Sequence, residues 1–171
     1  MNELVCEIRY AEVEIENPEI FLCKVRDLAI RFGSKIVCFD ADKISGKTHA
    51  ETALRHASRS IASGSSISNS FEMEALLYAA GSRQCSVATS FGLHAGNNRL
   101  YIGCCPGSDP LWDLLAGSMC FHPVPEPGIS PDKYDRLIQL FGITQEEVSA
   151  VGKDRIEDLV LERVVLLDVN K

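Results

Sequence analysis

The sequence has no long hydrophobic run. No apolar stretch approaches the ~18 residues that cross a bilayer, so we expect no membrane contact. The first residues also lack a basic segment followed by an apolar run, so we expect no secretory signal and a cytoplasmic protein. Seven cysteines are scattered along the chain without Cys-x-x-Cys spacing. In that compartment we expect them to be reduced thiols, most of them small core residues.

Positive charge is also scarce. The chain has 17 Lys and Arg residues against 24 Asp and Glu residues, which gives a net charge of −7. This balance excludes a protein that coats nucleic acid by charge alone. Residues 41–105 nevertheless carry 6 basic and 4 acidic groups, while the segments on either side are acidic. This window predicts a small anion-contacting patch, and chance clustering on a solvated surface is the alternative.

The length of 171 residues is enough for one core and too short for two ordinary domains, so we expect a single domain over residues 1–171. Hydrophobic periodicity predicts a mixed α/β (α+β) fold, with a short mixed sheet of about four to five strands flanked by helices on both sides. Predicted strands are 3–15, 35–40 (central), 100–105 and 119–124 (an edge). Predicted helices are 18–32, 48–63, 71–80, 85–91, 109–115, 131–141, a short turn from 144, and 154–168.

Residues 42–84 hold the densest set of polar signals. They begin with the turn Ile44-Ser45-Gly46-Lys47-Thr48-His49 and continue through a helix with basic side chains, a Ser-rich linker and a second helix. Thr48 and Glu51 have the spacing of a capping box. The turn places a lysine and a histidine at the positive end of a helix, where an anion is favoured. We expect this stretch to carry much of the function.

Residues 41–48 also match a relaxed phosphate-loop pattern between a predicted strand and a predicted helix. The residues inside the loop argue against a bound triphosphate. A phosphate loop wraps its ligand with consecutive backbone amides, which favours glycine, and Asp42 would set a carboxylate against the phosphates. A free-standing nucleotide- or small-molecule-binding regulator that uses the Gly46-Lys47-Thr48 turn is therefore kept only as the alternative function.

Catalytic and metal chemistry have little support in the sequence. Cys120 lies two residues from His122, but no nucleophile elbow is present, so core cysteines are preferred over a Cys–His hydrolase or a zinc site. His49 and His56 are seven residues apart, not the three or four that place two ligands together on a helix. We expect no catalytic residue, no metal and no cofactor.

Two further features indicate binding. Arg83 and Gln84 follow a helix-ending glycine and offer planar donors for a base edge or a phosphate, with an ordinary surface cap as the alternative. The last predicted helix has more apolar residues than one core-facing stripe needs, because Leu161, Val165 and Leu166 add to its main face. Such a helix is either fully buried or shared with a partner, and we favour the partner.

Four segments resemble the small subunit of the KEOPS (EKC) complex that binds the kinase/ATPase subunit, the PRPK-binding protein family, in its archaeal type. Residues 74–84 (EALLYAAGSRQ) are similar to the family's E-x-L-L-Y-x-x-G-x-R-Q block, the most specific match. The turn at 44–49 resembles I-x-G-x-x-H, and 88–93 fits the following A…FG(I/L) element. Thr144-Gln145-Glu146-Glu147 and the apolar last helix match how the family ends. The resemblance covers about residues 35–171; extra cysteines and a Pro-rich insertion at 123–131 depart from it.

The resemblance implies a non-catalytic adapter in tRNA threonylcarbamoyladenosine modification. Such a subunit binds and regulates the kinase/ATPase subunit directly, shares the complex with the transferase subunit, and helps recruit tRNA through its 3′ CCA end; no DNA contact is expected. Binding of a few unpaired nucleotides needs only a small basic pocket, so the protein as a whole need not be basic. For the tRNA contact we expect Lys47, His49, Arg55, Arg83 and Gln84, and for the kinase/ATPase interface Val160, Val164 and Leu167.

Overall fold

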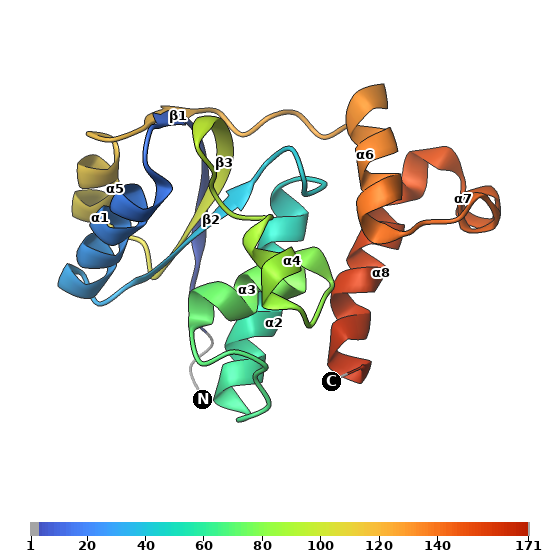
Figure 1. Ribbon diagram of the computed structural model, residues 1–171, viewed down its shortest axis with the longest axis horizontal. Helices are drawn as coiled ribbons and strands as arrows, with labels where there is room; N and C mark the ends of the chain where they lie inside the picture. Colours follow the sequence, from blue (N-terminus) through green and yellow to red (C-terminus); the bar gives the residue numbers. More distant parts are fainter. Residues whose placement is uncertain (1–3, 171) are drawn as a thin grey trace.

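The centre of the computed structural model, which describes residues 4–170, is a four-stranded sheet in the order β2-β3-β1-β4 (Figure 1). All three strand pairs are antiparallel, where the sequence had suggested a mixed sheet. The long ladder between β1 and β3 pairs Glu7 with Cys104 and Ile15 with Gly96. The strands are β1 (Glu7–Ile15), β2 (Lys35–Asp40), β3 (Gly96–Cys105) and β4 (Cys120–His122).

Helices cover both faces of the sheet, which confirms the predicted α+β architecture (Figure 1). Helices α1 and α5 lie on one face, and α2, α3 and α4 lie on the other, with α6, α7 and α8 beyond them. The helical elements are α1 (Pro18–Arg31), α2 (Lys47–Ala62), α3 (Phe71–Ala80), α4 (Cys85–Thr89), α5 (Asp109–Leu115), α6 (Pro131–Phe141), α7 (Gln145–Val151), the 3₁₀ turn η1 (Lys153–Arg155) and α8 (Ile156–Val169).

Strand β2 explains how the two halves of the core share one sheet. Successive side chains point to opposite faces, so Ile36 and Cys38 join the cluster under α1 and α5, while Val37 and Phe39 join the cluster under α2 and α3. Burial on both faces accounts for the continuous apolar run. The prediction of a central strand is wrong, however, because β2 lies at the sheet edge. The Asp40 N–H at this edge donates to the Phe91 carbonyl (2.7 Å).

Local chemistry sets most helix ends. The Asn17 side chain accepts from the Ile20 N–H at the start of α1, and the Ser130 hydroxyl accepts from the Lys133 N–H at the start of α6. Gly81 ends α3 in the left-handed conformation (φ 59°). Among the helices between residues 4 and 170, none is long and apolar enough to cross a membrane.

Helix α2 is buried more widely than its sequence suggests, because the sheet, α3 and α8 all pack against it. Thr52 is buried and donates its hydroxyl to the Thr48 carbonyl (2.8 Å). Ile61 is 40% exposed near the carboxyl end of the helix. The exposed residues of α2 are Lys47 and Thr48 at its amino end, Glu51, Arg55 and Arg59 along one side, and Ile61 and Ala62 at its carboxyl end.

Candidate functional site

A cavity of about 710 Å³ lies at the amino end of α2, between the sheet and α6. The first turns of three helices contribute to its wall: those of α2, α6 and α8. The Pro-rich segment 124–128, which joins β4 to α6, contributes as well. The lining residues are Tyr10, Ala41, Asp42, Ser45, Gly46, Lys47, Thr48, Arg99, Tyr101, Val124, Pro125, Glu126, Pro127, Gly128, Ser130, Asp132, Lys133, Arg136 and Glu157.

His49 fixes the turn that leads into α2. Its Nδ1 accepts from the Ser45 N–H (3.0 Å), and its Nε2–H donates to the Ala79 carbonyl at the end of α3 (2.8 Å). Burial lowers the pKa of His49 to about 4, and the nearby Lys133 ammonium lowers it further, against the hydrogen bond to Ala79. The ring is therefore neutral near pH 7. It holds the turn against α3 with both nitrogens engaged.

The amino end of α2 has no side-chain cap. Gly46 occupies the N-cap position, and no side chain within residues 4–170 caps the first amides of the helix. The predicted capping box of Thr48 and Glu51 is wrong because α2 begins one residue earlier, so Thr48 already lies inside the helix. Glu51 instead forms an ion pair with Lys47 (3.6 Å). The free amides and the helix dipole give this end of α2 a positive potential.

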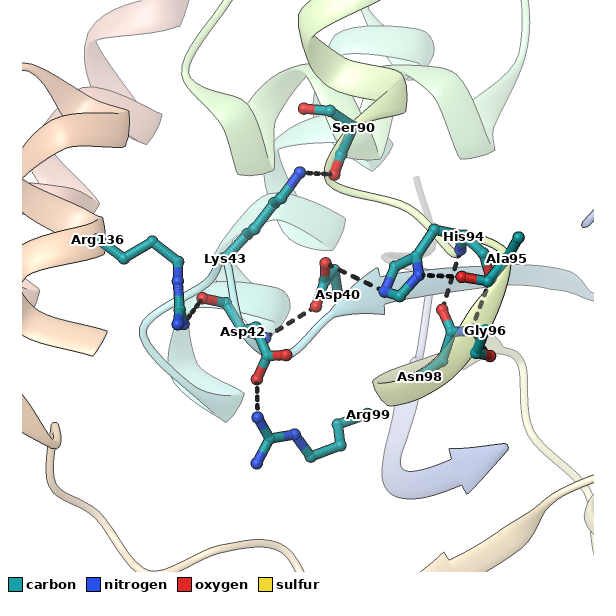
Figure 2. A network of polar contacts seen from close by, with 10 residues as sticks. All are labelled: Asp40, Asp42, Lys43, Ser90, His94, Ala95, Gly96, Asn98, Arg99 and Arg136. Atoms are coloured by element: carbon teal, nitrogen blue, oxygen red, sulfur yellow. Dashed lines mark hydrogen bonds and ion pairs between the residues drawn. The ribbon is translucent and has the colours of Figure 1, made fainter. Parts of the chain in front are cut away.

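Two arginines hold the turn at Asp42 from either side (Figure 2). Arg99 Nη2 forms an ion pair with the Asp42 carboxylate (2.7 Å), and Arg136 Nη1 donates to the Asp42 carbonyl (2.8 Å). Arg136 belongs to α6, so this hydrogen bond ties α6 to the turn before α2. Lys43 extends from the same turn and donates to the Ser90 carbonyl (2.6 Å).

A second polar group orders the loop between α4 and β3 (Figure 2). The Asn98 amide accepts from the His94 N–H (2.9 Å) and donates to the carbonyls of His94 and Gly96. His94 Nε2 lies 3.9 Å from the buried Asp40 carboxylate, which also accepts from the Asp42 N–H (2.9 Å). Burial raises the pKa of Asp40. These contacts position the turn that carries Asp42 and Ser45.

Two cavity residues matter that sequence reasoning did not single out. Ser45 is 6% exposed, and its Oγ has no hydrogen-bond partner among the described residues. An orphaned hydroxyl of this kind costs about 1–3 kcal/mol unless a ligand or solvent satisfies it. Burial lowers the pKa of Lys133 from its ordinary value. The Gly-Lys-Thr pattern drew attention to Lys47 and Thr48, whereas Lys133 comes from a helix far along the chain.

The structure does not gather the five predicted tRNA contacts into one pocket. Lys47 lines the cavity. Arg55 is exposed on α2, and Gln84 is exposed at the N-cap of α4. Arg83 is exposed and donates from Nη1 to the Asn170 carbonyl after α8 (2.8 Å). His49 is fully enclosed, so the idea that its ring contacts RNA does not fit this arrangement.

The predicted partner residues of α8 also need correction. Val160, Val164 and Leu167 are buried in the core that α8 shares with α2 and α3, so they cannot meet a partner subunit. The sequence showed an apolar helix but could not show which arc faces inward. The accessible apolar residues are the remaining ones, which we call the α8 strip: Leu161, Val165, Leu166 and Val169.

The carboxyl end of α8 is fixed by a polar cluster. Asp168 accepts from the Tyr78 hydroxyl of α3 and lies 2.6 Å from Nδ1 of His56 on α2. Farther up α8, Arg163 forms an ion pair with Glu147 of α7 (2.8 Å). No local pattern in the sequence predicts this cluster, because its members come from separate helices. It fixes α8, and with it the α8 strip, on the body of the domain.

The expectation of reduced thiols throughout is wrong. Cys6 and Cys105 form a disulfide that joins the segment before β1 to the end of β3. Cys38 and Cys104 are buried free thiols, and burial raises the pKa of each to about 12. Cys120 is exposed at the sheet edge.

The neighbouring His122 lies 3.6 Å from the Glu12 carboxylate on β1. Within residues 4–170, no three side chains of His, Cys, Asp or Glu are grouped as they would be around a metal ion.

In comparisons with known proteins, no family model and no curated sequence matches this chain.

Proposed function

We propose that this chain is a cytoplasmic, non-catalytic adapter subunit of the KEOPS complex in tRNA threonylcarbamoyladenosine modification. It binds and regulates the kinase/ATPase subunit directly, stands in the same complex as the transferase subunit, and helps recruit tRNA through its 3′ CCA end. The resemblance at residues 74–84 motivates the proposal, and an accessible apolar surface on α8 supports it.

The α8 strip is the observation on which the adapter role depends. Val165 is 45% exposed, Leu166 38% and Val169 75%, and all three lie within the last two turns of one helix. Leu161, Val165 and Val169 are spaced four residues apart and so share one face. Contiguous exposed apolar side chains on a monomer are typical of a protein interface. Because Asp168 fixes the helix, the strip is presented on a rigid element.

For tRNA binding, the proposal retains four of the five contact residues expected from the sequence. Lys47 at the cavity and the exposed Arg55, Arg83 and Gln84 can reach a ligand, whereas the enclosed His49 cannot. Arg83 uses Nη1 for Asn170 and retains further N–H donors.

Co-purification with the kinase/ATPase subunit tests the adapter role. The double variant Val165→Asp/Val169→Asp places two charges on the α8 strip without entering the core, so we expect a folded protein that no longer co-purifies. Ile30→Asp is the matched control, since Ile30 is an 80% exposed apolar residue on α1, on the other face of the sheet. Retention of the complex by the double variant would contradict the proposed interface.

A tRNA-binding assay tests the proposed contact with the 3′ CCA end. Wild-type protein should bind intact tRNA more tightly than tRNA without its CCA end. Lys47→Ala and Arg83→Ala should weaken only the CCA-dependent part, whereas Lys24→Ala, on α1, should change nothing. Equal binding of both tRNAs by the wild type would show that the CCA contact is wrong while leaving the adapter role open to its own test.

The alternative is a free-standing regulator that binds a nucleotide or another small molecule at the Gly46-Lys47-Thr48 turn. The cavity at the amino end of α2 is the observation in its favour, because all three residues line it. Titration of the isolated chain with ATP separates the two functions. Saturable, magnesium-dependent binding would favour the regulator, whereas an adapter shows none.

A further inference from the structure

Three positive helix ends meet at the cavity beside α2. Gly46, Lys47 and Thr48 at the start of α2 line the cavity, as do Ser130, Asp132 and Lys133 at the start of α6 and Glu157 in the first turn of α8. The amino end of a helix binds anions through its free amides and its dipole. Ser130 caps α6, while α2 has no side-chain cap. The amides of α2 are therefore the donors available to a ligand.

Ser45 supplies a second observation at this cavity, independent of the helix ends. The residue lines the cavity immediately before the α2 amides, is 6% exposed, and its Oγ has no partner among the described residues. Its backbone N–H is already used by His49, which fixes the residue in place. A serine hydroxyl beside free helix amides is a donor arrangement suited to the oxygens of a tetrahedral oxyanion.

The charged side chains of the cavity limit the charge of that anion. Lys47, Arg99, Lys133 and Arg136 are balanced by Asp42, Glu126, Asp132 and Glu157. Asp42 is already paired with Arg99. Lys133 is half-buried and lines the same cavity as Ser45. Because the cavity side chains carry no net charge, they disfavour a triphosphate more strongly than a single phosphate.

We propose that Ser45 Oγ, the first amides of α2 and the ammonium groups of Lys47 and Lys133 form a binding site for one phosphate group. The phosphate belongs to a phosphodiester of single-stranded RNA or to a nucleoside monophosphate. The site itself does not rest on the adapter role; only its use by the tRNA 3′ end does.

Nuclear magnetic resonance of the full chain can test the site directly. Inorganic phosphate is titrated at constant ionic strength against chloride, and the backbone amides are followed. We expect saturable shifts centred on Ser45, Lys47 and Thr48. Ser45→Ala should weaken phosphate binding about fivefold, the value of one hydrogen bond. Lys133→Met should weaken it at least as much, and Lys24→Met, on the opposite side of the sheet, should not.

Two competitors then identify the source of the phosphate. If a CCA-ending oligonucleotide displaces inorganic phosphate, the site holds an RNA phosphodiester; if only AMP displaces it, the site holds a mononucleotide. Either result supports the site. The proposal is overturned if the wild type shows no saturable shift, or if Ser45→Ala and Lys133→Met titrate like the Lys24 control. Such a failure would leave co-purification with the kinase/ATPase subunit unaffected, so it is separable from failure of the adapter role.

Discussion

His49 shows how one residue can be important without touching a ligand. Its two ring nitrogens join the turn at Ser45 to the end of α3 at Ala79, and its ring packs near Phe141 of α6. Protonation would place a hydrogen on Nδ1, which now accepts the Ser45 N–H. The same turn carries Asp42 and the start of the candidate phosphate site. The geometry of the site is therefore coupled to the neutral state of this histidine.

The stability of the protein should depend on pH through His49. The pKa of the folded ring is about 4, against 6.5 for an ordinary histidine. Between these values the unfolded chain binds a proton that the folded chain does not. The contribution of neutral His49 is thus complete above pH 6.5 and is lost as the pH falls from about 6.5 to about 4, by roughly 3 kcal/mol in total.

Urea denaturation of the wild type and of His49→Asn, at several pH values from 7.5 to 4, measures this effect. The variant should have a lower free energy of unfolding than the wild type at pH 7.5. This difference between the two proteins should shrink by roughly 3 kcal/mol as the pH falls toward 4. His122→Asn is the control, because His122 is half-exposed at the sheet edge. If the free energy of unfolding changes with pH in the same way for the wild type and the His49 variant, His49 is not the source of the pH dependence.

Glu74 is another residue whose part in the structure differs from what its motif suggests. It opens the block most similar to the KEOPS family, yet it is fully buried. Its carboxylate accepts from the Ser60 hydroxyl (2.8 Å) and from the N–H groups of Ile67 (3.0 Å) and Ser68 (2.7 Å). Glu74 thus closes the Ser-rich linker between α2 and α3. A sequence motif cannot separate such a fold-stabilising residue from a ligand contact.

At the scale of whole elements, the sequence predicts a helix end best when that end is determined by residues close by in the chain. The caps at Asn17, Ser130 and Gly81 were predictable because each depends on residues within one turn. The first part of β3, Gly96 to Arg99, was missed since its polar residues resemble a loop. These residues are extended because they pair with Glu12 to Ile15 of β1, which lie far away in the sequence.

Helix α8 separates two kinds of apolar residue that the sequence presents alike. Val164→Ala should lower the free energy of unfolding by about 2 kcal/mol, because Val164 is fully buried and the change leaves a cavity. Val165→Ala should change it by less than about 0.5 kcal/mol, because Val165 is 45% exposed. Denaturant titration measures both values. Equal losses in the two variants would show that the inward and outward arcs of α8 are wrongly assigned.

At the scale of the whole molecule, the candidate site is a product of long-range assembly. Its wall takes Lys47 from α2, Lys133 from α6 and Glu157 from α8, which are adjacent only after the domain has folded. The sequence could identify the Gly46-Lys47-Thr48 turn as a helix start that favours an anion. It could not show that Ser45 would be enclosed, or that a lysine of α6 would line the same cavity, since no local pattern encodes this arrangement.

The disulfide is a second long-range feature, and it lies at the end of the longest ladder. Cys6 and Cys105 are 99 residues apart in sequence, next to the register pair Glu7 and Cys104. The bond therefore locks the amino end of β1, an inner strand, to β3. Disulfides are uncommon in the cytoplasm of mesophiles but frequent in intracellular proteins of hyperthermophiles. Its presence bears on the stability of the sheet rather than on the phosphate cavity.

Removal of this cross-link should destabilise the protein without changing its fold. Replacing both Cys6 and Cys105 with serine should lower the free energy of unfolding by about 2–5 kcal/mol, because the unfolded chain regains the freedom of a loop of about 100 residues. Reduction of the wild type should give a similar loss. Cys85→Ser is the matched control, since Cys85 is an exposed free thiol.

Denaturant titrations with and without reductant measure these differences. The double variant should be insensitive to the reductant, whereas the wild type and the Cys85→Ser variant should both lose stability in it. A wild type that unfolds at the same denaturant concentration in both conditions would show that Cys6 and Cys105 are not joined in solution. The ladder of β1 with β3 would then hold the sheet by its hydrogen bonds and packing alone.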